Sequence, residues 1–161
     1  MGKTIDTLYM DAKIPPDIIL LSCGTLMWLL ARYLPGFGFE IGYHAVLALI
    51  IFLSGLVIIF SAKATLYKHG TTERPGRRSL PEVSTLVTTG IYGFSRNPVY
   101  LGMAVLLIGW TVMLTNWTAI IGVAVFAGVI TGFQIIPEEK TLEYVFGDEY
   151  RRYKSRVRRW I

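Results

Sequence analysis

Four apolar runs constrain the fold of this 161-residue chain more than any other feature. They cover residues 18–34, 41–62, 99–114 and 118–136. A helix needs about 20 apolar residues to cross the hydrocarbon core of a bilayer, so the second run is the strongest span by length. The third run is short and would cross a thinned bilayer or enter it only partly. The sequence predicts an all-α integral membrane helical bundle of about four transmembrane helices, followed by a cytoplasmic amphipathic C-terminal helix.

Composition agrees with a membrane protein of one domain. Hydrophobic residues make up 53% of the chain, which is too many for an ordinary soluble domain. The single cysteine, Cys23, lies inside an apolar run and excludes an internal disulfide and a cysteine-based zinc site. We therefore expect no metal and no nucleic-acid partner. Residues 1–161 are predicted to form a single membrane domain, with a helix pair over 1–62 and a catalytic, cofactor-binding core over 63–161.

The distribution of positive charge predicts the orientation in the membrane. Of the 16 lysines and arginines, six lie between the second and third runs and seven follow the fourth. None lies in the short turn between the third and fourth runs. Because positively charged segments stay on the cytoplasmic side, we expect a multi-pass protein with both termini in the cytoplasm.

The segment Gly90–Gly102 lies where a long polar connection meets the third apolar run. Arginine is always charged and its planar guanidinium grips a carboxylate or phosphate with two hydrogen bonds, so Arg96 at this boundary suggests an anion site. Pro98 suits the first turn of a helix, and Asn97 is placed to cap that helix. A capped membrane helix with an arginine reaching the headgroups is the alternative interpretation.

A second polar pair follows the fourth run. Pro137 predicts a kink or a new helix start, and the spacing of apolar residues predicts an amphipathic helix over residues 138–157. Glu138 and Glu139 stand in its first turn, where acidic side chains also stabilise the helix dipole without any site being present. Small residues are expected to let the third and fourth helices approach closely; these are Gly102, Gly109, Gly122, Gly128 and Gly132.

Two motifs together resemble the isoprenylcysteine carboxyl methyltransferase and phospholipid methyltransferase group of membrane enzymes. The first motif is 88–92 with 96–102, and the second combines Glu138 and Glu139 with the aromatic residues that follow and the terminal 157–161. The resemblance covers residues 70–161. Arg158 stands where the isoprenylcysteine enzymes usually carry proline, which leaves the acceptor open.

This resemblance implies S-adenosylmethionine as the cofactor, bound in a pocket that is not a Rossmann fold. A carboxylate, a ribose diol and a sulfonium must be recognised, which suits arginine, glutamate and aromatic side chains respectively. The implied cofactor-binding residues are Gly90, Tyr92, Arg96, Asn97, Pro98, Tyr100, Glu138 and Glu139. The implied catalytic residues are Arg96, Tyr100 and Glu138. The implied substrate-binding residues are Thr71, Thr72 and Gly102.

The expected reaction is methyl transfer to a lipophilic, membrane-embedded acceptor. A carboxylate acceptor needs no base, whereas an amine or thiol does, and His69, Glu138 and Tyr100 all remain candidates for that base. The alternative is a small four-helix transporter without enzymatic activity. A transporter normally carries a carboxylate deep within a span, whereas Asp17 and Glu40 stand at the ends of the apolar runs.

Overall fold

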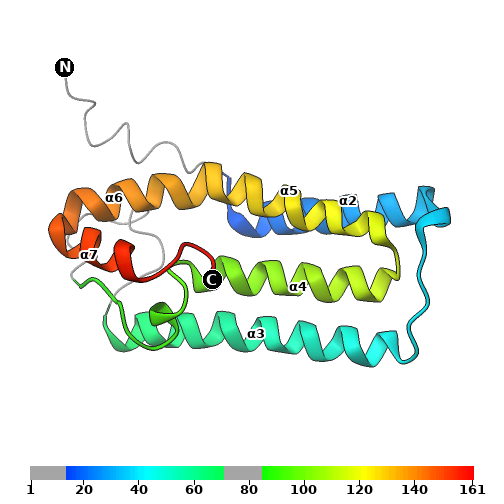
Figure 1. Ribbon diagram of the computed structural model, residues 1–161, viewed down its shortest axis with the longest axis horizontal. Helices are drawn as coiled ribbons and strands as arrows, with labels where there is room; N and C mark the ends of the chain where they lie inside the picture. The colour runs from blue at the N-terminus through cyan, green and yellow to red at the C-terminus, as the bar shows by residue number, and fades with distance from the viewer. Residues whose placement is uncertain (1–13, 71–84) are drawn as a thin grey trace, which may run out of the picture.

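The computed structural model describes residues 14–70 and 85–161, and these residues are almost entirely helical (Figure 1). The expectation of an all-α fold is confirmed for them. The α-helices are α2 (Pro16–Tyr33), α3 (His44–Lys68), α4 (Pro98–Leu114), α5 (Ile120–Ile130), α6 (Ile136–Phe146) and α7 (Asp148–Arg156). Short 3₁₀-helices η1 (Pro35–Phe37), η3 (Gly90–Gly93) and η4 (Trp117–Ala119) lie in the connections.

Two helical segments of the described residues are long and apolar enough to cross a bilayer, namely α3 and the stretch Trp117–Phe146. The helix α4 is a shorter apolar helix. Most of α3 is exposed, and its large uncovered side chains include Leu49, Phe52, Leu53, Val57 and Phe60. An apolar surface of this extent suits contact with lipid rather than with water.

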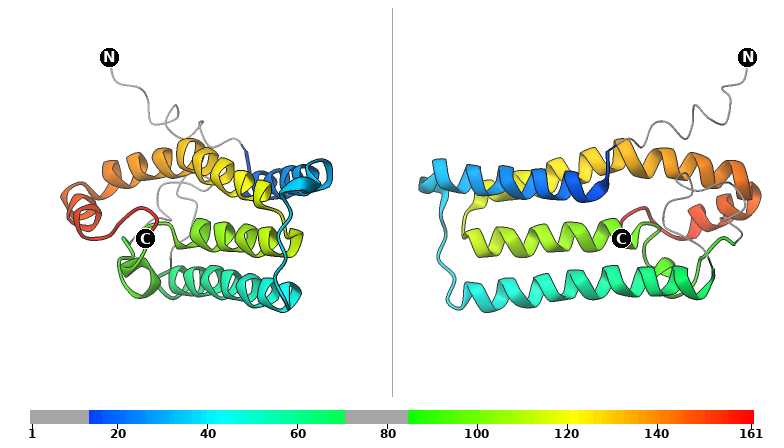
Figure 2. Two further views of the ribbon diagram at one scale, coloured as in Figure 1. Left: turned by 45° about the vertical axis from the view of Figure 1, so that its right-hand side comes forward. Right: turned by 180° about the vertical axis from the view of Figure 1, so that it is seen from behind.

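The four long segments pack in two pairs, with α3 along α4 and α2 along α5 (Figures 1 and 2). Each helix of the expected N-terminal pair therefore packs mainly against a helix from the C-terminal part. The described residues of both ranges, 1–62 and 63–161, thus contribute to one helical bundle.

The glycines lie at contacts between other pairs of helices than the predicted pair. A Cβ atom added to Gly102 would lie 2.6 Å from Cγ1 of Ile59 and 2.8 Å from the carbonyl oxygen of Gly55, both on α3. Gly109 likewise approaches the α3 backbone, while Gly122 approaches the carbonyl oxygen of Cys23 on α2. The prediction that these glycines bring the third and fourth helices together is therefore wrong. Close backbone approach uses small residues wherever two helices touch, and here the partners are α3 and α2.

The helix that precedes Pro137 does not end at this residue. The π-helical segment η5 (Thr131–Ile135) joins α5 to α6, and the backbone remains helical from Ile130 through Ile136. A π-turn already interrupts the regular hydrogen-bond ladder before the proline, so the missing Pro137 N–H is tolerated there. The predicted fresh helix start at Pro137 is not observed.

The break comes instead at Gly147, which has φ of 51° and ψ of −121°. Glycine reaches this region without the strain that a Cβ would cause. The single helix predicted over residues 138–157 is therefore divided into α6 and α7. The chain reverses at Gly147 and brings the C-terminal residues back to the N-terminal end of α4 (Figures 1 and 2).

Candidate functional site

A cavity of about 320 Å³ lies where the start of α4 meets α6, α7, the start of α2 and the end of α3. Most of the residues that the sequence predicted for the cofactor site line this one cavity. They are Tyr92, Arg96, Asn97, Pro98, Tyr100, Glu138 and Glu139. The reversal of the chain at Gly147 adds Tyr150 and Tyr153 of α7 to the wall of the cavity.

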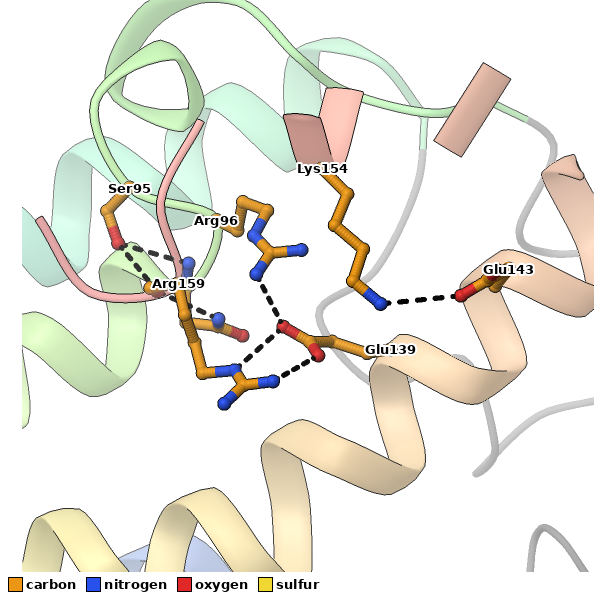
Figure 3. Close-up of polar contacts among 7 residues, drawn as sticks. Ser95, Arg96, Glu139, Glu143, Lys154 and Arg159 are labelled. Atoms are coloured by element: carbon orange, nitrogen blue, oxygen red, sulfur yellow. Dashed lines mark hydrogen bonds and ion pairs between the residues drawn. The ribbon is translucent and has the colours of Figure 1, made fainter. Parts of the chain in front are cut away.

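Three charged side chains from three parts of the chain form a cluster, and two of them, Arg96 and Glu139, line this cavity (Figure 3). Nη2 of Arg96 lies 3.1 Å from Oε1 of Glu139, and both side chains are more than nine-tenths buried. Arg159 donates from Nε to Oε1 of Glu139 at 3.0 Å and from Nη2 to Oε2 at 2.8 Å. Arg96 and Glu139, which the sequence analysis assigned to one site, are therefore in direct contact. Arg159 was missed by the sequence analysis.

Arg96 keeps unused hydrogen-bonding capacity inside the protein. Its Nε and Nη1 atoms are buried and have no hydrogen-bond partner. An unsatisfied buried donor is costly, and more so on a charged group. The cluster of Arg96, Glu139 and Arg159 also carries a net charge of +1. Both features suit an anionic group bound beside Arg96.

Glu138 faces the same cavity and has a different partner from its neighbour. The hydroxyl of Tyr100 donates to Oε1 of Glu138 at 2.7 Å, which is the length of a charge-assisted hydrogen bond. Tyr100 lies in the first turn of α4 and is buried. Two of the three candidate catalytic side chains are therefore bonded to one another.

The C-terminal tail holds the loop that carries Arg96. The main-chain N–H of Arg96 donates to the carbonyl oxygen of Arg158 at 3.1 Å. The Nδ2 atom of Asn97 donates to the carbonyl oxygen of Arg159 at 3.0 Å, and the hydroxyl of Ser95 contacts the same oxygen at 3.4 Å. Asn97 occupies the N-cap position of α4, but its side chain does not cap the helix. The predicted capping by this side chain is wrong because the tail competes for it.

Tyrosines of α7 complete the protein side of the cavity. The Tyr153 hydroxyl donates to the carbonyl oxygen of Tyr92 at 2.7 Å. Burial raises the pKa of Tyr150 to about 12, with a further rise from Glu139 that Arg96 opposes. Burial also raises the pKa of Tyr153. Both side chains are therefore neutral phenols at physiological pH.

Several predicted residues lie elsewhere. Gly90 has φ of +62° and turns the chain beside Thr65, outside the cavity lining. Gly102 is closed off by α3 and cannot leave the gap expected for a substrate. Thr71 and Thr72 lie outside the described residues. The ring of His69 contacts the carbonyl oxygen of Thr65, and His69 is not part of the lining.

Other lining residues had no clear sequence signal. Asp17 at the start of α2 and Lys63 near the end of α3 both line the cavity. Lys63 was assigned to the polar connection, but α3 continues to Lys68 and carries it into the bundle. Tyr150 and Tyr153 also line the cavity, and Arg159 bonds to the lining residue Glu139. All three fall within the second motif, which indicated their importance but not their contacts. Within the described ranges, no three His, Cys, Asp or Glu side chains are arranged to hold a metal.

Residues 43–149 match the sequence profile of the phospholipid methyltransferase family. The chain belongs to this family. It is 30% identical over 118 residues to a protein-S-isoprenylcysteine O-methyltransferase of Xenopus laevis, covering 73% of this chain and 40% of that protein. It is 33% identical over 108 residues to the Homo sapiens enzyme of the same name, covering 63% of this chain and 37% of that enzyme.

A third relative is an uncharacterized protein of Haemophilus influenzae, 52% identical over 63 residues, which cover 39% of this chain and all of that protein. The chain thus spans only about two fifths of the isoprenylcysteine enzymes that it matches. No solved structure shows significant similarity to the chain. Family membership and the apolar helices identify a membrane protein of a methyltransferase family, which favours an enzyme over the transporter considered above.

Proposed function

We propose that this protein transfers a methyl group from S-adenosylmethionine to a lipophilic acceptor held in the membrane. The observation that carries the proposal is the buried guanidinium of Arg96, with two N–H groups lacking partners beside a cavity. A carboxylate bound beside Arg96 would supply an acceptor that the protein itself does not give these groups. The cofactor carries such a carboxylate on its methionine end.

The remaining lining residues fit the other parts of the cofactor. We assign the ribose hydroxyls to Glu138, a carboxylate that lines the cavity, and we assign Glu139 to holding the two arginines. Tyr92 and Tyr100 offer aromatic surface to a cation. Asn97, Pro98 and Gly90 act through the backbone shape of the loop that presents Arg96. When bound, S-adenosylmethionine supplies a methyl group that its sulfonium already activates.

The chain's own residues then align the acceptor, exclude water and hold protons. The pair formed by Tyr100 and Glu138 can take a proton from an amine or thiol acceptor at Oε1 of Glu138. An anionic acceptor needs no such step. In this proposal Arg96 binds the cofactor and orients it, while Glu139 and the tail hold Arg96.

The acceptor is proposed to enter from the lipid. Apolar side chains from different helices line part of the cavity, among them Leu66, Met103 and Leu142. Packing of Gly102 against α3 closes the route first expected there, whereas Pro16 of α2 and Val99 of α4 both border the cavity. We therefore place the entrance between α2 and α4. A long acyl or prenyl chain could remain in the bilayer there while its polar end reaches the site.

An acceptor series with one reactive head and increasing chain length tests the function. Methyl transfer from labelled S-adenosylmethionine should occur, and apparent affinity corrected for partition should rise with chain length. Each CH₂ buried contributes about 0.8 kcal/mol. Equal efficiency with a short hydrophilic acceptor would refute lateral entry, and the absence of labelled product with every head group tried would count against the enzyme activity.

The proposed topology has four membrane segments with both termini in the cytoplasm. The charge distribution supports this topology. The four segments are the two long apolar helices together with α2 and α4, which are shorter. Single cysteines at the exposed positions Trp117 and Ser155 in a Cys23-free variant should react with impermeant reagent from opposite sides. Labelling of both positions from the same side would overturn the topology.

A further inference from the structure

The terminal segment of the chain contributes more than packing to the cavity. Arg159 donates a hydrogen bond to each carboxylate oxygen of Glu139, from Nε to Oε1 at 3.0 Å and from Nη2 to Oε2 at 2.8 Å. This two-pronged geometry is the strong form of an arginine–carboxylate pair. Arg96 reaches the same carboxylate with Nη2 alone, at 3.1 Å from Oε1.

This division of one carboxylate between two arginines explains why Arg96 has unused donors. A buried arginine beside an unshared carboxylate would form two parallel hydrogen bonds with it. Arg159 occupies Oε2 and shares Oε1, so only one contact is left for Arg96 (Figure 3). Nε and Nη1 of Arg96 therefore stay without a protein partner.

Resting on the function proposed above, we propose that Arg159 is the positioning residue that keeps Arg96 open to a ligand carboxylate. It prevents Glu139 from pairing fully with Arg96, and its positive charge leaves the three-residue cluster at a net charge of +1. Its carbonyl oxygen also fixes the Arg96 loop by accepting from Nδ2 of Asn97. Without this side chain, Arg96 and Glu139 would close into a neutral, two-pronged pair.

The test compares two ligands that differ only at the end facing Arg96. S-Adenosylhomocysteine has the amino-acid carboxylate, whereas 5′-methylthioadenosine keeps the adenosine and the thioether but has no amino-acid end. Their dissociation constants are measured by calorimetry on the full chain in detergent. The variants are Arg159→Gln and Arg159→Lys, and the control is Arg156→Gln, which removes the same charge from an exposed position on α7.

In Arg159→Gln, the affinity for S-adenosylhomocysteine should fall roughly 10- to 100-fold, the value of a charged hydrogen bond. The affinity for 5′-methylthioadenosine should change little, and so should the melting temperature without ligand, because Arg96 and Glu139 then neutralise one another. Arg159→Lys should show a smaller loss, since one ammonium contact still engages Glu139. Arg156→Gln should bind both ligands like the wild type.

Three results would overturn this inference while leaving the proposed function in place. They are an unchanged affinity for S-adenosylhomocysteine in Arg159→Gln, an equal loss for both ligands, and an equal loss in the Arg156→Gln control. Failure of the wild-type chain to bind S-adenosylhomocysteine would instead refute the proposed function, and this inference with it.

Discussion

Replacing Glu139 by glutamine is expected to cause the largest loss of stability of any single change at the site. The carboxylate is the shared acceptor of Arg96 and Arg159, and its side chain is only 7% exposed. A neutral amide would leave two arginines without their counter-charge. Removing one partner of a buried ion pair costs about 3–5 kcal/mol, and the half-exposed Arg159 places the expected loss of unfolding free energy at about 3 kcal/mol. Titration with sodium dodecyl sulfate in mixed micelles measures it.

The matched control for this change is Glu143→Gln on the same helix. Glu143 pairs with the exposed side chains of Arg151 and Lys154. Exposed pairs contribute little because water and salt screen them. If Glu139→Gln were no more destabilising than Glu143→Gln, the buried cluster would have no net stabilising effect.

Replacing Arg96 by lysine should weaken binding of S-adenosylhomocysteine by about 1.5–3 kcal/mol, the value of a charged hydrogen bond. A lysine ammonium can still pair with Glu139, so the fold should be retained. It cannot also reproduce the further Nε and Nη1 donors of the rigid planar guanidinium. Calorimetry in detergent measures the dissociation constant, and a melting curve shows that the variant is folded.

Arg152→Lys on the exposed side of α7 is the control for this substitution. It should bind the ligand like the wild type. Unchanged affinity in Arg96→Lys would return Arg96 to a purely structural role as the ion-pair partner of Glu139.

The helical framework followed from local patterns. The apolar run over 99–114 became α4, which begins at Pro98, because proline fits the first helical turn. The second run was extended by several residues beyond Ala62, since Lys63 and Lys68 are good helix formers that apolar patterning alone does not include. The break at Gly147 was missed because a glycine inside a periodic pattern is only a weak signal of a helix end.

The sequence by itself determined the residue types of the candidate site and the two segments of the chain that carry them. Arg96, Tyr100, Glu138 and Glu139 were found from motifs, because charged side chains beside apolar runs need a reason to be there. The bond between Tyr100 and Glu138, and the choice of Glu139 as partner of Arg96, required the tertiary structure.

Only the tertiary structure decided which helices the glycines join and how the tail closes the site. Periodicity shows that a helix has a face for close packing, but not which neighbour will fill it, so Gly102 was given the wrong partner. Arg159 stands 63 residues after Arg96 in the numbering of the chain. Its contact with Glu139 depends on the reversal at Gly147, which is a long-range consequence of one backbone conformation. A group of lysines and arginines near the C-terminus does not indicate by its sequence which of these side chains turns toward the protein interior.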